Sequence, residues 1–182
     1  MRTIIACLGF LLLGTLALSA QEPVTPAAYD LIVGPRLGIT YVFTSAKEFT
    51  AAINERRDER GSYVPLMSVF GVAAEQRLLL GETTSHFAAQ ELLLLSGMEQ
   101  SLALLSGSLL MGYRDATGFE AGFGPTMSPT GMGVVIAAGW TFTYRGVYIP
   151  VDLSFVLPNK QRPANIALTT GFNFVIKSVS SQ

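Results

Sequence analysis

The stretch 168–177, "LTTGFNFVIK", alternates between two kinds of side chain with a period of two residues. One set of positions is large and mostly apolar: Leu168, Thr170, Phe172, Phe174 and Ile176. The other set is smaller or polar: Thr169, Gly171, Asn173 and Val175. Successive side chains of a strand point to opposite faces, so this stretch predicts a strand whose two faces meet different surroundings.

Similar runs, separated by turn residues, recur along the chain. They cover 34–43, 64–80, 86–96, 101–113, 118–126, 132–144, 147–157 and 165–176. Short strands at this spacing are typical of an all-β barrel or sandwich. There are eight such runs, and of the two architectures we expect the barrel, with eight antiparallel up-and-down strands.

The segment 86–105, "HFAAQELLLLSGMEQSLALL", fits this scheme least well, because it is built from strong helix formers. Ser96 and Gly97 make a natural break between two strands, and we favour strands here. A helical hairpin stays an alternative for these residues.

The first twenty residues, "MRTIIACLGFLLLGTLALSA", have a basic start, an apolar run and a small-residue end, which predicts a secretory signal peptide over 1–20. The apolar run is shorter than a membrane-spanning helix requires. We expect the mature chain, 21–182, to be a single β-barrel domain. Its stability cannot come from disulfides, because the only cysteine of the sequence is Cys7.

The most charged segment predicts a helix over about 45–60, in the first long connection. Ser45 can cap it, and Glu48 stands three residues later, as in a capping box. A glycine follows the segment and would end it. Phe49 and Ile53 share one side at helical spacing, so we expect the helix to rest against the barrel mouth.

Strands with large residues on one side fit either a protein core or a lipid bilayer, and periodicity alone cannot choose between them. If both chain ends face the periplasm, the aromatic residues form two belts, as in membrane barrels. The inner belt would hold Trp140, Phe142, Tyr144, Tyr148, Phe172 and Phe174, and the outer belt Tyr41, Phe43, Phe123 and Phe155. The longest connection, 44–62, would then be external.

Five charged residues within the runs have the parity of the inward face: Arg36, Glu75, Arg77, Glu120 and Asp152. We expect them to form a buried polar network lining the lumen. In one interpretation the arginines neutralise the carboxylates and fix strand register. In the other, the network forms a constricted polar path or a small-ligand site.

Composition gives little support to catalysis, metal binding or nucleic-acid binding. The formal net charge is −1 at pH 7, and there is one histidine. His86 follows Ser85 in an expected turn, where neighbours in sequence rarely align as nucleophile and base. One histidine and no mature cysteine leave few metal ligands. We therefore predict a chain that is not an enzyme, binds no metal, cofactor or nucleic acid, and has no catalytic residues.

Across 34–176 the pattern resembles the small bacterial outer-membrane β-barrels, in the broad manner of the OmpX and OmpW kind. Thr169, Gly171, Phe174 and Ile176 match the terminal signal that such proteins present to the barrel-assembly machinery, although "KSVSSQ" follows instead of a terminal Phe. The resemblance implies a Gram-negative-type outer membrane as location, with its lipid and the assembly machinery as partners.

The leading hypothesis is a non-enzymatic outer-membrane barrel with a structural or surface role, or limited passage of small solutes. The alternative is a soluble periplasmic barrel that binds an apolar ligand, with its large residues pointing inward. That alternative would show water a face nearly free of charge, because the only lysines are Lys47, Lys160 and Lys177, all outside the expected strands.

Overall fold

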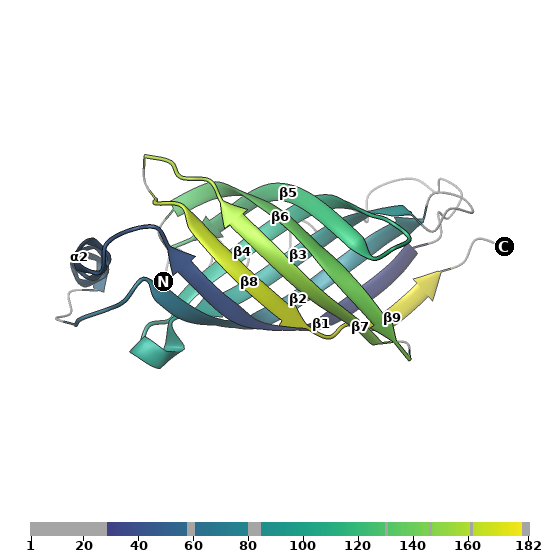
Figure 1. Ribbon diagram of the computed structural model, residues 1–182, viewed down its shortest axis with the longest axis horizontal. Coiled ribbons are helices and arrows are strands. Elements are labelled where there is room, and N and C mark those ends of the chain that lie inside the picture. Colours follow the sequence, from purple (N-terminus) through teal and green to yellow (C-terminus); the bar gives the residue numbers. More distant parts are fainter. Residues whose placement is uncertain are drawn as a thin grey trace.

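The structure is a computed structural model that describes residues 29–57, 61–79, 85–129, 131–145, 147–160 and 162–179. The predicted signal peptide, 1–20, lies outside these residues. The described part is a barrel of antiparallel strands with a short helix at one end (Figure 1).

The strands follow one another around the barrel in chain order. The elements are β1 (Tyr29–Val42), α2 (Ala46–Arg57), β2 (Leu66–Leu79), β3 (His86–Ser96), the 3₁₀ helix η1 (Met98–Gln100), β4 (Leu104–Arg114), β5 (Phe119–Ser128), β6 (Gly131–Tyr144), β7 (Val147–Val156), β8 (Asn165–Gly171) and β9 (Phe174–Val179). Strand β1 pairs with β2 on one side and with β8 and β9 on the other, which closes the sheet. The predicted eight-stranded antiparallel barrel is confirmed.

The last strand of the barrel is interrupted, where the sequence predicts one continuous run over 165–176. Both β8 and β9 pair with β1, and the break between them lies opposite Pro35, which has no N–H to donate. At Gly34, an added Cβ would lie 1.9 Å from the carbonyl oxygen of Phe172, so only glycine allows this close approach. Asn173 turns instead to β7, where its N–H donates to the carbonyl of Tyr148 at 2.7 Å.

Residues 86–105 form strands, so the helical hairpin is wrong. Strand β3 pairs along its whole length with both β2 and β4. These two ladders satisfy its backbone groups on both sides and override the helix preference of its leucines. The connection to β4 turns at Gly97 and Ser101, which have φ of 85° and 58°.

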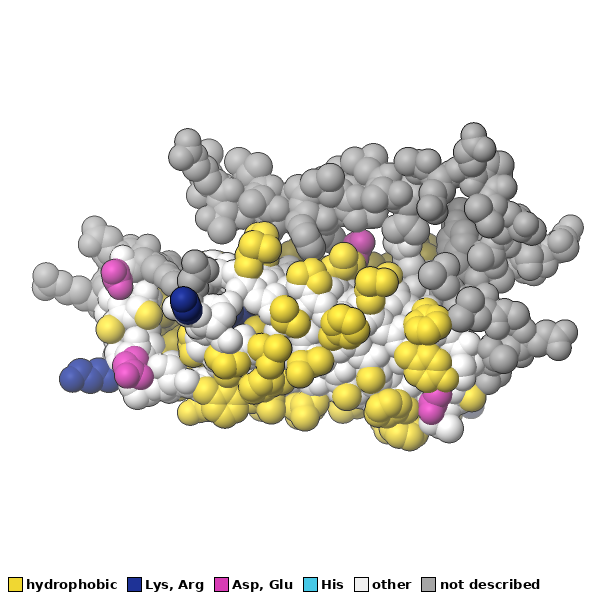
Figure 2. Space-filling view, turned by 90° about the horizontal axis from the view of Figure 1, so that it is seen from above, with side chains coloured by type: hydrophobic (Ala, Val, Ile, Leu, Met, Phe, Trp, Pro, Cys, Tyr) yellow, Lys and Arg dark blue, Asp and Glu magenta, His cyan; other side chains and the backbone are white. Residues whose placement is uncertain are grey.

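The two faces of the barrel wall differ as the sequence predicts, with the large apolar residues outside. On the outer face Phe123 is 64% exposed and Leu153 is 51% exposed, whereas the inward Ala73 and Thr169 are buried. Figure 2 shows hydrophobic side chains spread over the visible wall of the barrel. The soluble alternative requires the opposite arrangement, with large residues inside.

Aromatic residues gather at both ends of the outer face. The barrel end that carries α2 is called the helix end, and the opposite end the turn end. Edge-to-face ring pairs at the turn end are Phe87–Tyr113, Phe119–Trp140 and Phe172–Phe174; at the helix end Phe43 contacts both Tyr41 and Phe155. Tyr148 is an exception to the predicted belts. Its ring lies inside the barrel, 4.6 Å from the guanidinium carbon of Arg77.

Helix α2 closes over the helix end through a small apolar cluster. Phe49 and Ile53 pack with Tyr63, Met67 and Leu102, all of them buried. The predicted capping box is present: the N–H of Glu48 donates to Ser45 Oγ at 3.2 Å, and the N–H of Ser45 donates to Glu48 Oε2 at 3.3 Å. The helix therefore rests against the barrel mouth, as expected from its apolar side.

Candidate functional site: the barrel lumen

The five charged residues predicted to line the lumen all point inward. Arg36, Glu75, Arg77 and Glu120 are between 1% and 9% exposed. Asp152 faces the same interior, where it lines a cavity together with Glu75 and Glu120. Of the five, Glu75, Arg77 and Glu120 belong to a connected cluster toward the turn end, Asp152 lines the cavity beside that cluster, and Arg36 lies apart.

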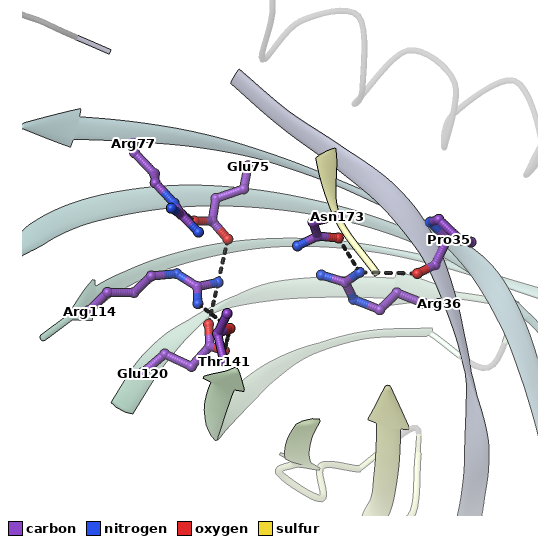
Figure 3. A network of polar contacts seen from close by, with 8 residues as sticks. All are labelled: Pro35, Arg36, Glu75, Arg77, Arg114, Glu120, Thr141 and Asn173. Atoms are coloured by element: carbon purple, nitrogen blue, oxygen red, sulfur yellow. Dashed lines mark hydrogen bonds and ion pairs between the residues drawn. The ribbon is translucent and has the colours of Figure 1, made fainter. Parts of the chain in front are cut away.

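The connected cluster joins four strands of the wall (Figure 3). Glu75 on β2 accepts from Arg77 Nε at 2.6 Å and from Arg114 Nη2 on β4. Arg114 also pairs with Glu120 on β5 and donates to the hydroxyl of Thr141 on β6 at 2.7 Å. That hydroxyl donates in turn to Glu120 Oε1 at 2.7 Å. These residues, Glu75, Arg77, Arg114, Glu120 and Thr141, are called the lumen network.

Arg36 lies apart from the lumen network and is 1% exposed. Its Nη1 donates to Asn173 Oδ1 at 2.6 Å and to the carbonyl of Pro35 at 3.1 Å. In the described part of the chain, its Nε and Nη2 have no hydrogen-bond partner. Its charge is compensated at longer range by Asp152, Glu75 and Glu120. Arg36 thus ties the interrupted last strand to β1.

The interior charges balance within the described residues. Toward the turn end, three arginines face three carboxylates: Arg36, Arg77 and Arg114 against Glu75, Glu120 and Asp152. Burying ion pairs in this way is stable only when each charge keeps its partners. The arrangement therefore places three basic and three acidic side chains in a narrow barrel, and the ion pairs fix Glu75, Arg77, Arg114 and Glu120.

Sequence reasoning missed Arg114, which joins the two carboxylates of the network. The predicted strand ends at residue 113, which leaves Arg114 just outside it. In the structure β4 includes it, and its side chain is buried. Parity is the signal that could have found it, because Arg114 lies two and four residues after Gly112 and Leu110, which line the same interior.

Two cavities occupy the lumen on the helix-end side of the network. The smaller, of about 70 Å³, is lined by network residues and by Gln90 and Leu92. The larger, of about 350 Å³, lies under α2 and is called the helix-end cavity. Leu94, Ser108, Val135 and Ser154 line both cavities, so the two are neighbours along the barrel axis.

Among the strand residues whose side chains the structure describes, one charged residue, Glu91, faces outward. Glu91 lies in the middle of β3, opposite Ala74 on β2 and Leu109 on β4. Its neighbours in β3, Gln90 and Leu92, line the interior cavity, so the side chain of Glu91 points to the outer face. The parity argument for inward charges thus has an exception in the middle of the wall.

Nothing in the described lumen indicates catalysis or a metal centre. His86 is buried at the start of β3, at the turn end, and Ser85 precedes it outside the strand. No group of three or more metal-ligating side chains occurs among the described residues. The same residues contain no helix with the length and apolarity to cross a membrane.

Comparison with known proteins finds similarity in structure only. No family model matches the sequence, and no curated protein matches it. The outer-membrane protein Ail of Yersinia pestis, solved in a phospholipid bilayer nanodisc, aligns with a TM-score of 0.45 and 9% identity, over 80% of this chain and 99% of that chain. The crystal structure of Ail, the attachment invasion locus protein of Yersinia pestis, aligns with a TM-score of 0.44 and 10% identity, over 81% of this chain and 99% of that chain. Identity this low gives no information on what the chain does.

Proposed function

We propose that this chain is a non-enzymatic outer-membrane β-barrel with a structural or surface role in the cell envelope. The observation that carries the proposal is the outer face of the wall, which is apolar around the barrel and edged by aromatic residues at both ends. Such a face is solvated by lipid, while the closed ladder satisfies the backbone groups that hydrocarbon cannot.

Strand length supports the same proposal. A tilted strand needs about 9–11 residues to cross a bilayer. Strands β3 and β4 have 11 residues and β5 and β7 have 10, whereas β1, β2 and β6 have 14. Tight turns at the turn end and the long helical connection at the other end match the usual asymmetry, which puts the helix end outside.

Electrophoretic mobility tests the proposed barrel directly. We expect the protein extracted from membranes to migrate faster before boiling than after it, because an intact barrel stays compact in detergent. Recovery in the soluble periplasmic fraction, with the same mobility before and after boiling, would contradict the proposal.

Limited passage of small solutes is a second candidate, favoured by the two neighbouring cavities. The lumen network stands between these cavities and the turn end, so we expect no steady conductance from the wild-type protein in a planar bilayer. Arg77→Ala separates the two roles of the network. Conductance from a folded Arg77→Ala barrel would support a constricted path, whereas loss of folding without altered permeability would support a purely structural network.

We also propose that Thr169, Gly171, Phe174 and Ile176 act as the signal to the barrel-assembly machinery. Phe174 is 48% exposed on the outer face of β9, at the strand's start. We expect Phe174→Ser to reduce the folded fraction in cells while the purified variant still refolds in detergent. Phe142→Ser is the matched control, because Phe142 is an equally outward aromatic residue at the same end. Equal loss for both variants would contradict a specific signal.

A further inference from the structure

The helix-end cavity has the size of a small-molecule site. Its volume of about 350 Å³ falls within the range of about 300–1,000 Å³ that is usual for ligand pockets. Most of its wall area is apolar, hydroxyl side chains of serine and threonine lie between the apolar ones, and residues of α2 form part of the lining. Apolar lining residues include Val42, Phe49, Ile53, Met67, Val69, Leu104 and Val156.

One basic side chain, Arg162, lines this cavity from the loop between β7 and β8. The residue is 6% exposed, and its Nη1 is buried without a hydrogen-bond partner in the described part of the chain. Burial lowers the pKa of its guanidinium. The guanidinium nevertheless stays charged near neutral pH, so a cation without a bonded anion faces an apolar space.

The loop around Arg162 holds the backbone of this residue in place. The N–H of Arg162 donates to Asn159 Oδ1 at 3.1 Å, and Asn159 Nδ2 donates to the carbonyl of Met132 on β6 at 2.7 Å. Gly133 on β6 lies next to the arginine side chain, since a Cβ added there would be in ordinary contact with Cδ and Nη1 of Arg162, at 3.5 Å from each. The hydrogen-bonded loop therefore places the guanidinium beside β6 at the cavity wall.

The acidic residue at this cavity, Glu48, does not neutralise Arg162. Its Oε2 accepts hydrogen bonds from the hydroxyls of Ser45 and Thr44 at 3.0 and 3.1 Å, as part of the helix cap. No ion pair joins Arg162 to a carboxylate in the described part of the chain. The charges of the lumen network balance one another. The guanidinium of Arg162 has no such partner, so an anion from outside the chain would stabilise it.

We propose that the helix-end cavity binds a single-chain amphiphile with an anionic head group. The alkyl chain lies in the aliphatic part of the cavity, and the head group accepts hydrogen bonds from Arg162. A charge-assisted pair of this kind in an apolar surrounding fixes the orientation of the ligand. The inference rests on the cavity and on Arg162, so it can fail while the proposed membrane location holds.

Calorimetric titration of the protein in bilayer nanodiscs tests the proposal, with empty nanodiscs as the blank for partitioning into lipid. The probes are dodecanoate and the uncharged dodecanol. We expect saturable binding of both. Arg162→Gln should weaken dodecanoate about tenfold and leave dodecanol unchanged, because only the acid gains from the guanidinium. Arg162→Lys, which keeps the charge, should retain most of the affinity.

Two matched controls make the test specific. Lys160→Gln removes an exposed positive charge from the same loop and should change nothing. Ala167→Phe fills the cavity from β8 and should abolish binding of both probes, whereas Leu168→Phe adds the same ring on the outer face and should not. Folding of each variant is checked by its mobility before boiling.

The proposal is overturned if the wild-type protein shows no saturable binding, if Ala167→Phe binds like Leu168→Phe, or if Lys160→Gln weakens dodecanoate as much as Arg162→Gln. If Arg162→Gln does not fold, the comparison of Ala167→Phe with Leu168→Phe still decides whether the cavity is the site. A titration with lysophosphatidylglycerol then distinguishes the source of the ligand: tighter binding than dodecanoate indicates a lysolipid, and weaker binding a free fatty acid.

Discussion

At the scale of single residues, the barrel interior depends on Glu75. This carboxylate is 1% exposed and accepts hydrogen bonds from two arginines, Arg77 and Arg114. Removing one member of a buried ion cluster leaves the others without compensation, which is far more destabilising than the cluster is stabilising. Glu75 therefore has a larger effect on stability than any exposed charge of the chain.

We predict that Glu75→Ala lowers the free energy of unfolding by about 3–5 kcal/mol. The measurement is urea unfolding of the barrel in detergent, followed by the loss of the fast-migrating form. Glu55→Ala on the exposed side of α2 is the control and should change stability by less than about 0.5 kcal/mol. Equal effects of the two substitutions would show that the network contributes little.

For Glu91 we predict the opposite effect on stability, because this residue faces outward from the middle of β3. A carboxylate on the lipid face destabilises a membrane barrel, though less than an arginine or lysine would. We expect Glu91→Leu to raise the free energy of unfolding by no more than about 2 kcal/mol in lipid vesicles. A loss of stability would mean that the outer face at Glu91 meets a polar partner and not lipid.

At the scale of elements, α2 is held by its cap and by its apolar side. Three hydrogen bonds to the Glu48 carboxylate lower its pKa. The hydroxyl of Ser45 lowers it most, followed by the N–H of Ser45 and then by the hydroxyl of Thr44. A carboxylate with a lowered folded-state pKa stabilises the folded helix at neutral pH. That contribution is lost as the pH falls through the lowered pKa.

We predict that Ser45→Ala destabilises the helix by about 1 kcal/mol and leaves the barrel transition unchanged. Hydrogen exchange of the α2 amides should become faster, and the difference from wild type should shrink in acid as Glu48 protonates. Ser62→Ala, an exposed serine of the same connection, is the control. A shift of the global unfolding transition would instead mean that the cap is coupled to the barrel.

The elements also show how far the sequence predicts the structure. Alternation gives the strands to within a few residues, since a residue's parity decides whether it meets the interior or the outside. At Tyr148 and Arg114 parity is right, and the errors have other causes. The parity of Tyr148 places it inside, but its aromatic character suggested a belt; Arg114 lies one residue past an assumed strand end.

The interruption at Phe172–Asn173 was beyond sequence reasoning for a different reason. It depends on the register of three strands, which brings Pro35 and Gly34 opposite the last strand and Tyr148 within reach of Asn173. Register is set between strands that lie far apart in the sequence, so the alternation within one strand does not predict it. The helix-end cavity and the position of Arg162 are hidden for the same reason.

At the scale of the whole molecule, charge and apolar surface are sorted in the reverse of a soluble protein. The outer wall is largely apolar (Figure 2). The interior holds ion pairs near the turn end, and a mostly apolar cavity lies under α2. An eight-stranded barrel is just wide enough for side chains to fill. The side chains of the lumen network fill that width near the turn end. We therefore expect the wild-type protein not to conduct ions across a bilayer.

The single tryptophan of the chain tests the lipid-facing wall most directly. Trp140 is 42% exposed on the outer face near the turn end, beside Phe119. Its fluorescence is measured in vesicles of lipids brominated along their acyl chains, with unbrominated lipid as the reference. The account predicts a blue-shifted emission that the brominated lipids quench strongly, because the indole touches lipid. Unquenched emission from a folded barrel that stays in the aqueous phase would contradict it.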